Sequence, residues 1–396
     1  MRFHRRLFLL NALALRVFLV ALGVWTLVVG VVVAQDTDED GPIMKLTRNS
    51  EPIGDVSRSR TERLERYEVD PDNPDLRSVD GIVYSRDMKK LLAVPQKYPV
   101  KDVIIPTGVE TIEEGAFSGC LLVESVSTPE SLKEIGDLAF AECRSLRSVV
   151  LSEGVVTIGS SAFEACCALT SVQAPKSLKT IGSKAFFDCT TLESVFIPEG
   201  VRSIGSNAFF RCYSLASFDV AEGNERYKSV DGVLFSKGGK TLLNYPIASK
   251  RKSYSIPAGV ETIGEDAFWH CATLETVYLP ESVKKIGPSG FCYCLGLKTI
   301  YLPEAIEEIG RMAFSMCPSL GEIAVPRKVE KIADYAFKDC SSLRFAELSE
   351  NVKSIGEMAF YGCKSLTIIA PQGSFAEQYA NENDVQFESH VVPREV

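Results

Sequence analysis

A 23-residue period constrains this chain more than any other feature of its sequence. Ten phenylalanines recur in two runs of five, with steps of 23 residues inside each run and 59 residues between the runs. An isoleucine stands five residues before each Phe, and a cysteine stands three residues after it. The ten are Phe117, Phe140, Phe163, Phe186, Phe209, Phe268, Phe291, Phe314, Phe337 and Phe360. A unit this short cannot bury its own apolar residues, so the period predicts a solenoid in which each copy covers its neighbour.

A second apolar group follows each cysteine and predicts a short strand. In one copy it reads Leu192, Val195 and Ile197, followed by Pro198. The alternation at its end suits a strand with Val195 and Ile197 pointing inward, and a proline then ends the ladder because it cannot donate a hydrogen bond. Stacked copies of this strand would form a parallel sheet.

The repeated residues resemble the BspA-like, or treponemal-class, leucine-rich repeat. Its 23-residue unit has the form C-x-x-L-x-x-I-x-L-P-x-x-L-x-x-I-G-x-x-A-F-x-x-C, and the match covers about residues 103–370. Departures from it are minor; for example, Glu113 and Ala333 replace the Gly, Gly290 replaces the Ala and Val123 replaces the first Leu. The resemblance implies an α/β-type leucine-rich repeat solenoid whose parallel sheet lines a concave face. It also implies a microbial surface protein that attaches to host matrix proteins or to other cells.

The material between the two runs is itself duplicated. "SVDGIVYSRDMKKLLAVP" at 78–95 matches "SVDGVLFSKGGKTLLNYP" at 229–246 with a displacement of 151 residues, the same as that from Phe117 to Phe268. In each copy two apolar runs flank a polar turn, which predicts a β-hairpin at the start of each five-repeat block. The expected order is a signal segment (1–34), a polar linker (35–77), an N-terminal hairpin module (78–102), repeats 1–5 (103–222), an inserted hairpin module (223–253), repeats 6–10 (254–371) and a C-terminal cap and tail (372–396).

The N-terminal segment predicts export. Arginines precede an uncharged apolar run over 17–34 that ends Val32-Val33-Ala34, with small residues where a signal peptidase cuts. The same run is just long enough to be an uncleaved anchor, and Arg5-Arg6 fits either a twin-arginine signal or an ordinary basic region. We therefore expect a cell-surface or secreted protein, with the periplasm as the alternative.

The net charge limits the classes of partner that the chain is expected to bind. The net charge is −9, and it becomes −13 if residues 1–34 are removed, because they hold four arginines and no acidic residue. Such an excess of acidic residues disfavours non-specific binding to nucleic acid. A protein ligand is the expected partner, with membrane contact only through an uncleaved N-terminal segment.

The chain offers little for catalysis, and we expect neither an enzyme nor a bound metal or cofactor. Its three histidines are His4, His270 and His390, too few for a histidine-based triad or zinc site. Gly239-Lys240-Thr241 imitates the end of a phosphate-binding loop, but Leu234 stands where that loop needs a glycine. His270 beside Cys271 could activate a thiol only if both side chains pointed the same way.

Two interpretations are open for the cysteines of the repeats, which we call the cysteine row. Ten of the twelve cysteines occupy one position of the repeat, and Cys167 and Cys292 lie outside it. Equivalent positions in stacked layers would lie close enough for disulfides, which suit an exported chain. The row nevertheless follows the core pattern, where a thiol is a good small apolar group, so we favour reduced, packed cysteines.

The outward positions of the strands are the candidate binding face. Their third positions include Phe196, Tyr278 and Tyr301, and their first positions are nearly all hydroxyl residues. The candidate residues are Ser148, Ser171, Ser194, Phe196, Ser217, Thr276, Tyr278, Thr299 and Tyr301. These types also suit any exposed strand, but exposed aromatics are frequent anchors for protein partners. The sequence thus indicates a protein-binding scaffold, either a surface adhesin or an envelope protein that binds another envelope protein.

Overall fold

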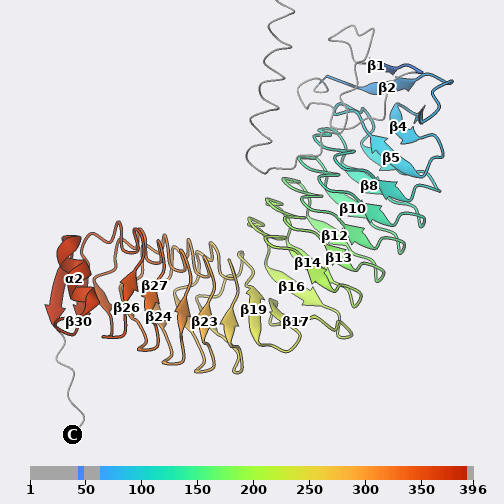
Figure 1. Cartoon of the computed structure of the whole chain (residues 1–396). Helices are drawn as coiled ribbons and strands as arrows, with labels where there is room; N and C mark the ends of the chain where they lie inside the picture. The colour runs from blue at the N-terminus through green and yellow to red at the C-terminus, as the bar shows by residue number, and fades with distance from the viewer. Residues whose placement is uncertain (1–42, 49–62, 390–396) are drawn as a thin grey trace, which may run out of the picture.

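The computed structural model describes residues 43–48 and 63–389, so the expected signal segment lies outside the described residues. Figure 1 shows the turns of the chain stacked in sequence order along one extended array. The array changes direction where the inserted module, around β17 and β19, joins its two halves. This is the predicted solenoid, and within the described residues its regular elements are short strands and one helix.

Each turn of the solenoid carries two strands. One turn, for example, holds a long strand over Ser148–Val150 and a short strand over Thr157–Ile158. The long strand is the predicted one, and its middle residue, Val149, is buried. The short strand was not predicted, because two residues are too few to show a period-two pattern. Ile158, in the invariant place five residues before Phe163, is its buried member.

In the first block the long strands pair in parallel, with each residue opposite its equivalent 23 positions along the chain. They form one sheet of four and a separate pair, with no ladder between β12 and β14. The long strands are β6 (Asp102–Ile104), β8 (Ser125–Ser127), β10 (Ser148–Val150), β12 (Ser171–Gln173), β14 (Ser194–Ile197) and β16 (Ser217–Val220). The short strands are β7 (Thr111–Ile112), β9 (Glu134–Ile135), β11 (Thr157–Ile158), β13 (Thr180–Ile181) and β15 (Ser203–Ile204).

The second block repeats this plan, and its long-strand ladder is interrupted between β24 and β26. The long strands are β20 (Ser253–Ser255), β22 (Thr276–Tyr278), β24 (Thr299–Tyr301), β26 (Glu322–Ala324), β28 (Phe345–Glu347) and β30 (Thr367–Ala370). The short strands are β21 (Thr262–Ile263), β23 (Lys285–Ile286), β25 (Glu308–Ile309), β27 (Lys331–Ile332) and β29 (Ser354–Ile355).

The repeated phenylalanines form a continuous stack inside each block. The rings of Phe140 and Phe163 are 5.0 Å apart and inclined by 1°, and the other neighbouring pairs lie 4.6–5.6 Å apart. Each such pair contributes roughly 0.5–1.5 kcal/mol beyond its apolar burial. The stack explains the strict 23-residue step, since an inserted residue would take one ring out of line.

Both duplicated modules form the predicted hairpin and add one strand to it. In the first, β3 (Leu76–Val79), β4 (Ile82–Ser85) and β5 (Lys90–Ala93) pair antiparallel, and β5 then pairs in parallel with β7. In the second, β17 (Tyr227–Val230), β18 (Val233–Ser236) and β19 (Thr241–Asn244) pair antiparallel in the same way. β19 then pairs in parallel with β21. Each module thus starts the short-strand sheet of its block.

The segment expected as a polar linker is partly folded, which corrects that prediction. β1 (Ile43–Leu46) and β2 (Arg66–Val69) pair in parallel with a step of 23 residues. Leu46, Leu64 and Tyr67 are buried in a small core against the first module. β1 and β2 lie 151 residues before β14 and β16, so the duplicated block begins earlier than the matching hairpin sequences show.

The C-terminal end is closed by a helix and a strand, which form the expected cap. α2 spans Phe375–Glu382 and begins at Ser374, whose hydroxyl accepts a hydrogen bond from the amide of Glu377. Ala376 and Ala380 are buried, and Tyr379 packs against Phe360 at the end of the ring stack. β31 (Gln386–Ser389) pairs with β30, so the cap also extends the long-strand sheet.

Candidate functional site

The long strands expose the predicted columns of side chains. Along each strand the middle residue faces the core, as Val277 and Ile300 do, because successive strand residues point to opposite faces. The third residue of the long strands is exposed, including Phe196, Tyr278 and Tyr301, except on β30, where Ile369 is half-buried. The hydroxyl residues at the first positions are exposed at Ser171 and Ser194 and half-buried at Ser148, Ser217, Thr276 and Thr299.

Tyr278 and Tyr301 form the most prominent pair on this face. They are register partners on β22 and β24, and their exposed fractions are 50% and 66%. Thr276 and Thr299 pair in the same way at the first positions of the two strands. Two broad rings beside two hydroxyl groups offer a rigid amphipathic surface, which loses little side-chain entropy when a partner binds.

A charged triplet borders the tyrosine pair. Lys252, Glu275 and Lys298 directly precede β20, β22 and β24. Both lysine Nζ atoms lie 2.7 Å from a carboxylate oxygen of Glu275. The hydrogen bonds from Lys252 and Lys298, helped by their charges, lower the pKa of Glu275 to about 2. The face therefore combines aromatic contact area with charges that are fixed in position.

The candidate residues do not form one continuous patch. Phe196 lies on the two-stranded sheet β14–β16, whereas Tyr278 and Tyr301 lie on β20–β22–β24. Phe196 instead borders an apolar recess at the missing ladder between β12 and β14. The recess is small, with a free volume of about 20 Å³, and Val172, Ala174 and Phe209 also line it. The sequence could not reveal this separation, because it depends on which strands are paired.

The exposed apolar residues of the face extend beyond the candidate residues. Phe345, on β28, is 43% exposed and Ile104, on β6, is 80% exposed. Phe345 stands at the first position of β28, opposite Glu322 of β26, whereas β22 and β24 carry Thr276 and Thr299 at this position. An alignment of the repeats shows this departure from the hydroxyl residues, so the sequence could have revealed Phe345 as a surface residue.

The residues considered for catalysis lie in different environments. Cys271 is buried and its burial raises the pKa of the thiol, whereas the half-buried His270 ring contacts Tyr213 with centroids 5.3 Å apart. Gly239-Lys240-Thr241 leads from a hairpin turn into β19, so a strand follows it where a phosphate-binding loop needs a helix. Within 43–48 and 63–389, no group of three His, Cys, Asp or Glu residues is placed to hold a metal ion.

The cysteine row consists of free thiols. All twelve cysteines are unpaired, and nine of the ten row members are buried, with Cys363 half-buried. In most turns the thiol donates to the backbone oxygen of the repeat phenylalanine one turn earlier, with Sγ to O distances of 3.0–3.2 Å. Burial raises the pKa of Cys212 to about 12. Outside the row, Cys292 is buried and Cys167 is half-buried.

None of the helices in the described residues is both long and apolar enough to cross a bilayer. The expected signal or anchor at 1–34 lies outside the described residues.

Comparison with known proteins agrees with this geometry. The family described as the BspA type leucine rich repeat region, in six copies, matches residues 96–231 and 248–367. A leucine rich cell surface protein from Faecalibacterium prausnitzii is 28% identical, with a TM-score of 0.62, over 80% of this chain and 90% of its own. The pneumococcal vaccine antigen PcpA is 23% identical with a TM-score of 0.69, over 81% of this chain and 88% of its own. A leucine-rich repeat protein from Eubacterium ventriosum is 21% identical with a TM-score of 0.64, over 75% of this chain and 82% of its own. No curated protein matches the chain.

Proposed function

Because this chain belongs to the BspA-type leucine-rich repeat family, we propose that it is an exported protein-binding scaffold that attaches to host matrix or cell-surface proteins. The similarity to the cell surface protein of F. prausnitzii supports an extracellular place of action. The long-strand face is the proposed contact surface.

The observation that carries this proposal is the tyrosine pair. Tyr278 and Tyr301 are held side by side by the ladder between β22 and β24, yet half or more of each side chain is exposed. Their backbone is fixed by the solenoid, so little order has to be gained on binding. Tyrosine is among the residues that most often dominate the binding energy of protein interfaces.

Binding to immobilised matrix proteins tests the contact surface. Fibronectin, laminin and collagen are presented separately to the full chain and to the double variant Tyr278→Ser, Tyr301→Ser. We expect at least one matrix protein to bind the unmodified chain and the double variant to bind about tenfold or more weakly, because hot-spot tyrosines contribute about 2 kcal/mol. Tyr361→Ser is the matched control, since Tyr361 is 61% exposed but lies outside the long strands. Equal losses in both variants would contradict a site on this face.

Accessibility on intact cells tests the place of action. An antibody against the repeats should bind intact cells, and added protease should remove the signal. Protection until the envelope is opened would contradict the adhesin and favour the alternative, a scaffold that binds another envelope protein.

A further inference from the structure

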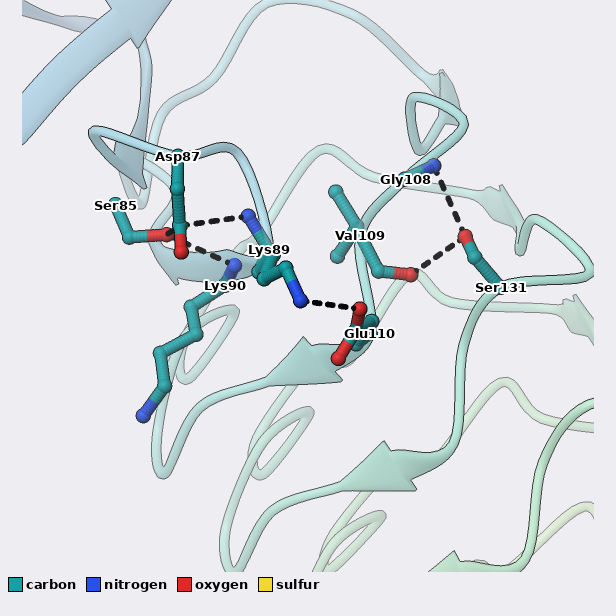
Figure 2. A network of polar contacts seen from close by, with 8 residues as sticks. All are labelled: Ser85, Asp87, Lys89, Lys90, Gly108, Val109, Glu110 and Ser131. Carbon is teal, nitrogen blue, oxygen red and sulfur yellow. Dashed lines mark hydrogen bonds and ion pairs between the residues drawn. The ribbon is translucent and has the colours of Figure 1, made fainter.

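The turn between β4 and β5 is closed by its own carboxylate. Figure 2 shows Asp87 accepting hydrogen bonds from the hydroxyl of Ser85, at 2.6 Å, and from the amide of Lys89, at 3.0 Å. The hydroxyl oxygen of Ser85 accepts in turn from the amide of Lys90, at 3.0 Å. The bonds from Ser85 and Lys89 lower the pKa of Asp87, so this turn is built to hold a negative charge.

The turn between β18 and β19 has the same backbone but no carboxylate. Met88 and Gly239, which correspond to each other, have φ angles of 64° and 70°. The hydroxyl of Ser236 accepts from the amide of Thr241 at 3.1 Å, as Ser85 does from Lys90. Gly238 stands where Asp87 stands in the first module, so residue 238 has no side-chain acceptor for the Ser236 hydroxyl or the Lys240 amide. The Ser236 hydroxyl instead lies 3.5 Å from the backbone oxygen of Thr241, at the long limit of a hydrogen bond.

A cation and an open hollow lie at this second turn. The ammonium of Lys228 packs against Gly239, where an added Cβ would lie 2.6 Å from Nζ. A hollow with room for about 210 Å³ opens there, lined by Lys228, Val230, Phe235, Gly238, Gly239, Lys240 and residues 257–260 of the next turn. The ammonium of Lys240 is held by Glu261 at the border. Lys228 is thus placed to supply the charge for an acidic group that enters the hollow.

We propose that the β18–β19 turn binds a carboxylate group of an external ligand, an Asp or Glu side chain or a C-terminus of a polypeptide, in the place that Asp87 fills in the β4–β5 turn. The Ser236 hydroxyl and the Lys240 amide donate to this carboxylate, and Lys228 pairs with its charge. Hydrogen bonds from ionised partners of this kind are stronger than those between neutral groups. The site is separate from the tyrosine pair, so either can fail without the other.

Exchanging the residues of the two turns tests this proposal. The full chain, labelled with ¹⁵N at glycine and lysine, is titrated with sodium acetate at constant ionic strength, with chloride as the balancing anion. We expect a saturable shift of the Lys240 amide signal in the unmodified chain. Gly238→Asp should abolish it, because the new side chain occupies the site. Lys228→Gln should weaken binding about tenfold, the value of one charged interaction of about 1.4 kcal/mol.

The reverse exchange provides the gain of function. Asp87→Gly should create a second saturable site, seen at the Lys89 amide. Gly238→Asp is not expected to disturb the fold, since a Cβ there meets nothing closer than the Lys240 side chain at 3.9 Å.

Three results would overturn the proposal. They are a response of Gly238→Asp equal to that of the unmodified chain, a linear shift without saturation, and saturation by sulfate or phosphate but not by acetate. A short glutamate-containing peptide, titrated in parallel, should saturate the same signal; saturation by acetate alone would contradict a polypeptide source.

Discussion

The thiol of Cys166 donates a hydrogen bond to the backbone oxygen of Phe140, which lies 3.0 Å away in the preceding turn. The same oxygen accepts from the amide of Cys143, so both of its lone pairs are used. Each row cysteine that makes this contact therefore joins two turns and fills the space beside the ring stack. This accounts for cysteine at a position that any small apolar residue could otherwise occupy.

Replacing a row cysteine should destabilise the array. We expect Cys166→Ala to lower the free energy of unfolding by about 1–2 kcal/mol, through the cavity that it leaves and the lost bond to Phe140. Cys167→Ala, one residue further and only half-buried, should cost clearly less. Urea unfolding followed by circular dichroism measures both, and equal losses would contradict a special role for the row.

Asn224 should be one of the most sensitive single positions. Its side chain is fully buried, donates to the backbone oxygens of Pro198 and Val201, and accepts from the amides of Arg226 and Tyr227. Asn224→Ala leaves these buried groups without their partner, so we expect a loss of about 2–4 kcal/mol in unfolding free energy.

Asn351→Ala is the control for this experiment. The side chain of Asn351 is exposed and donates to the backbone oxygen of Arg327, so we expect its removal to cost less than about 0.5 kcal/mol. Similar losses for Asn224→Ala and Asn351→Ala would show that the buried bonds of Asn224 do not hold the module in place.

Glycine at a strained backbone position should raise the stability of the fold. In every turn the residue two before the repeat Phe is left-handed; Gly115 and Asn207 suit this conformation, whereas Met358, with φ 50°, does not. Because Met358 is 45% exposed, Met358→Gly should raise the unfolding free energy by about 0.5–1 kcal/mol net of the entropy of glycine. Glu357→Gly, at an ordinary φ, should instead lower it by a similar amount. Thermal unfolding separates the two, and a loss in both would contradict the strain.

The sequence predicted the parts of the fold that repeat and missed those that are short or altered. The steps from Phe117 to Phe209 fix the ring stack, and the alternation through Val195 and Ile197 fixes which side chains face inward. The short strand at Thr157–Ile158 was missed, because its pairing partner is visible only in three dimensions. β1 and β2 were missed because Arg58 and Thr61 stand where the repeat has its phenylalanine and cysteine. The apolar pattern of the strands is still present, since Met44 and Leu46 stand in the places of Val195 and Ile197.

The candidate site was predictable residue by residue but not as a surface. Alternation alone placed Phe196, Tyr278 and Tyr301 outward. That Tyr278 and Tyr301 are partners, and that Phe196 lies on another sheet, follows from pairing across turns and from the breaks in the ladder. The exchange of Asp87 for Gly238 was present in the aligned modules, but its meaning required the hydrogen bonds of the first turn.

The ion pairs of Glu275 should give the array a stability that depends on pH. Its pKa falls from the usual 4.5 to about 2 in the folded chain, through the hydrogen bonds and charges of Lys252 and Lys298. A lowered pKa means that the ionised form favours folding, so the contribution to stability is complete above pH 4.5 and disappears as the pH falls through 2.

Glu275→Gln should therefore have a lower urea midpoint than the unmodified chain at pH 7, and the two midpoints should converge near pH 2. The difference should also shrink in 1 M salt, because the two lysine side chains are exposed. Glu281→Gln, at an exposed position outside these ion pairs, serves as the control. A difference at pH 7 no larger than that of the control, or one that persists at pH 2, would contradict the assignment to Lys252 and Lys298.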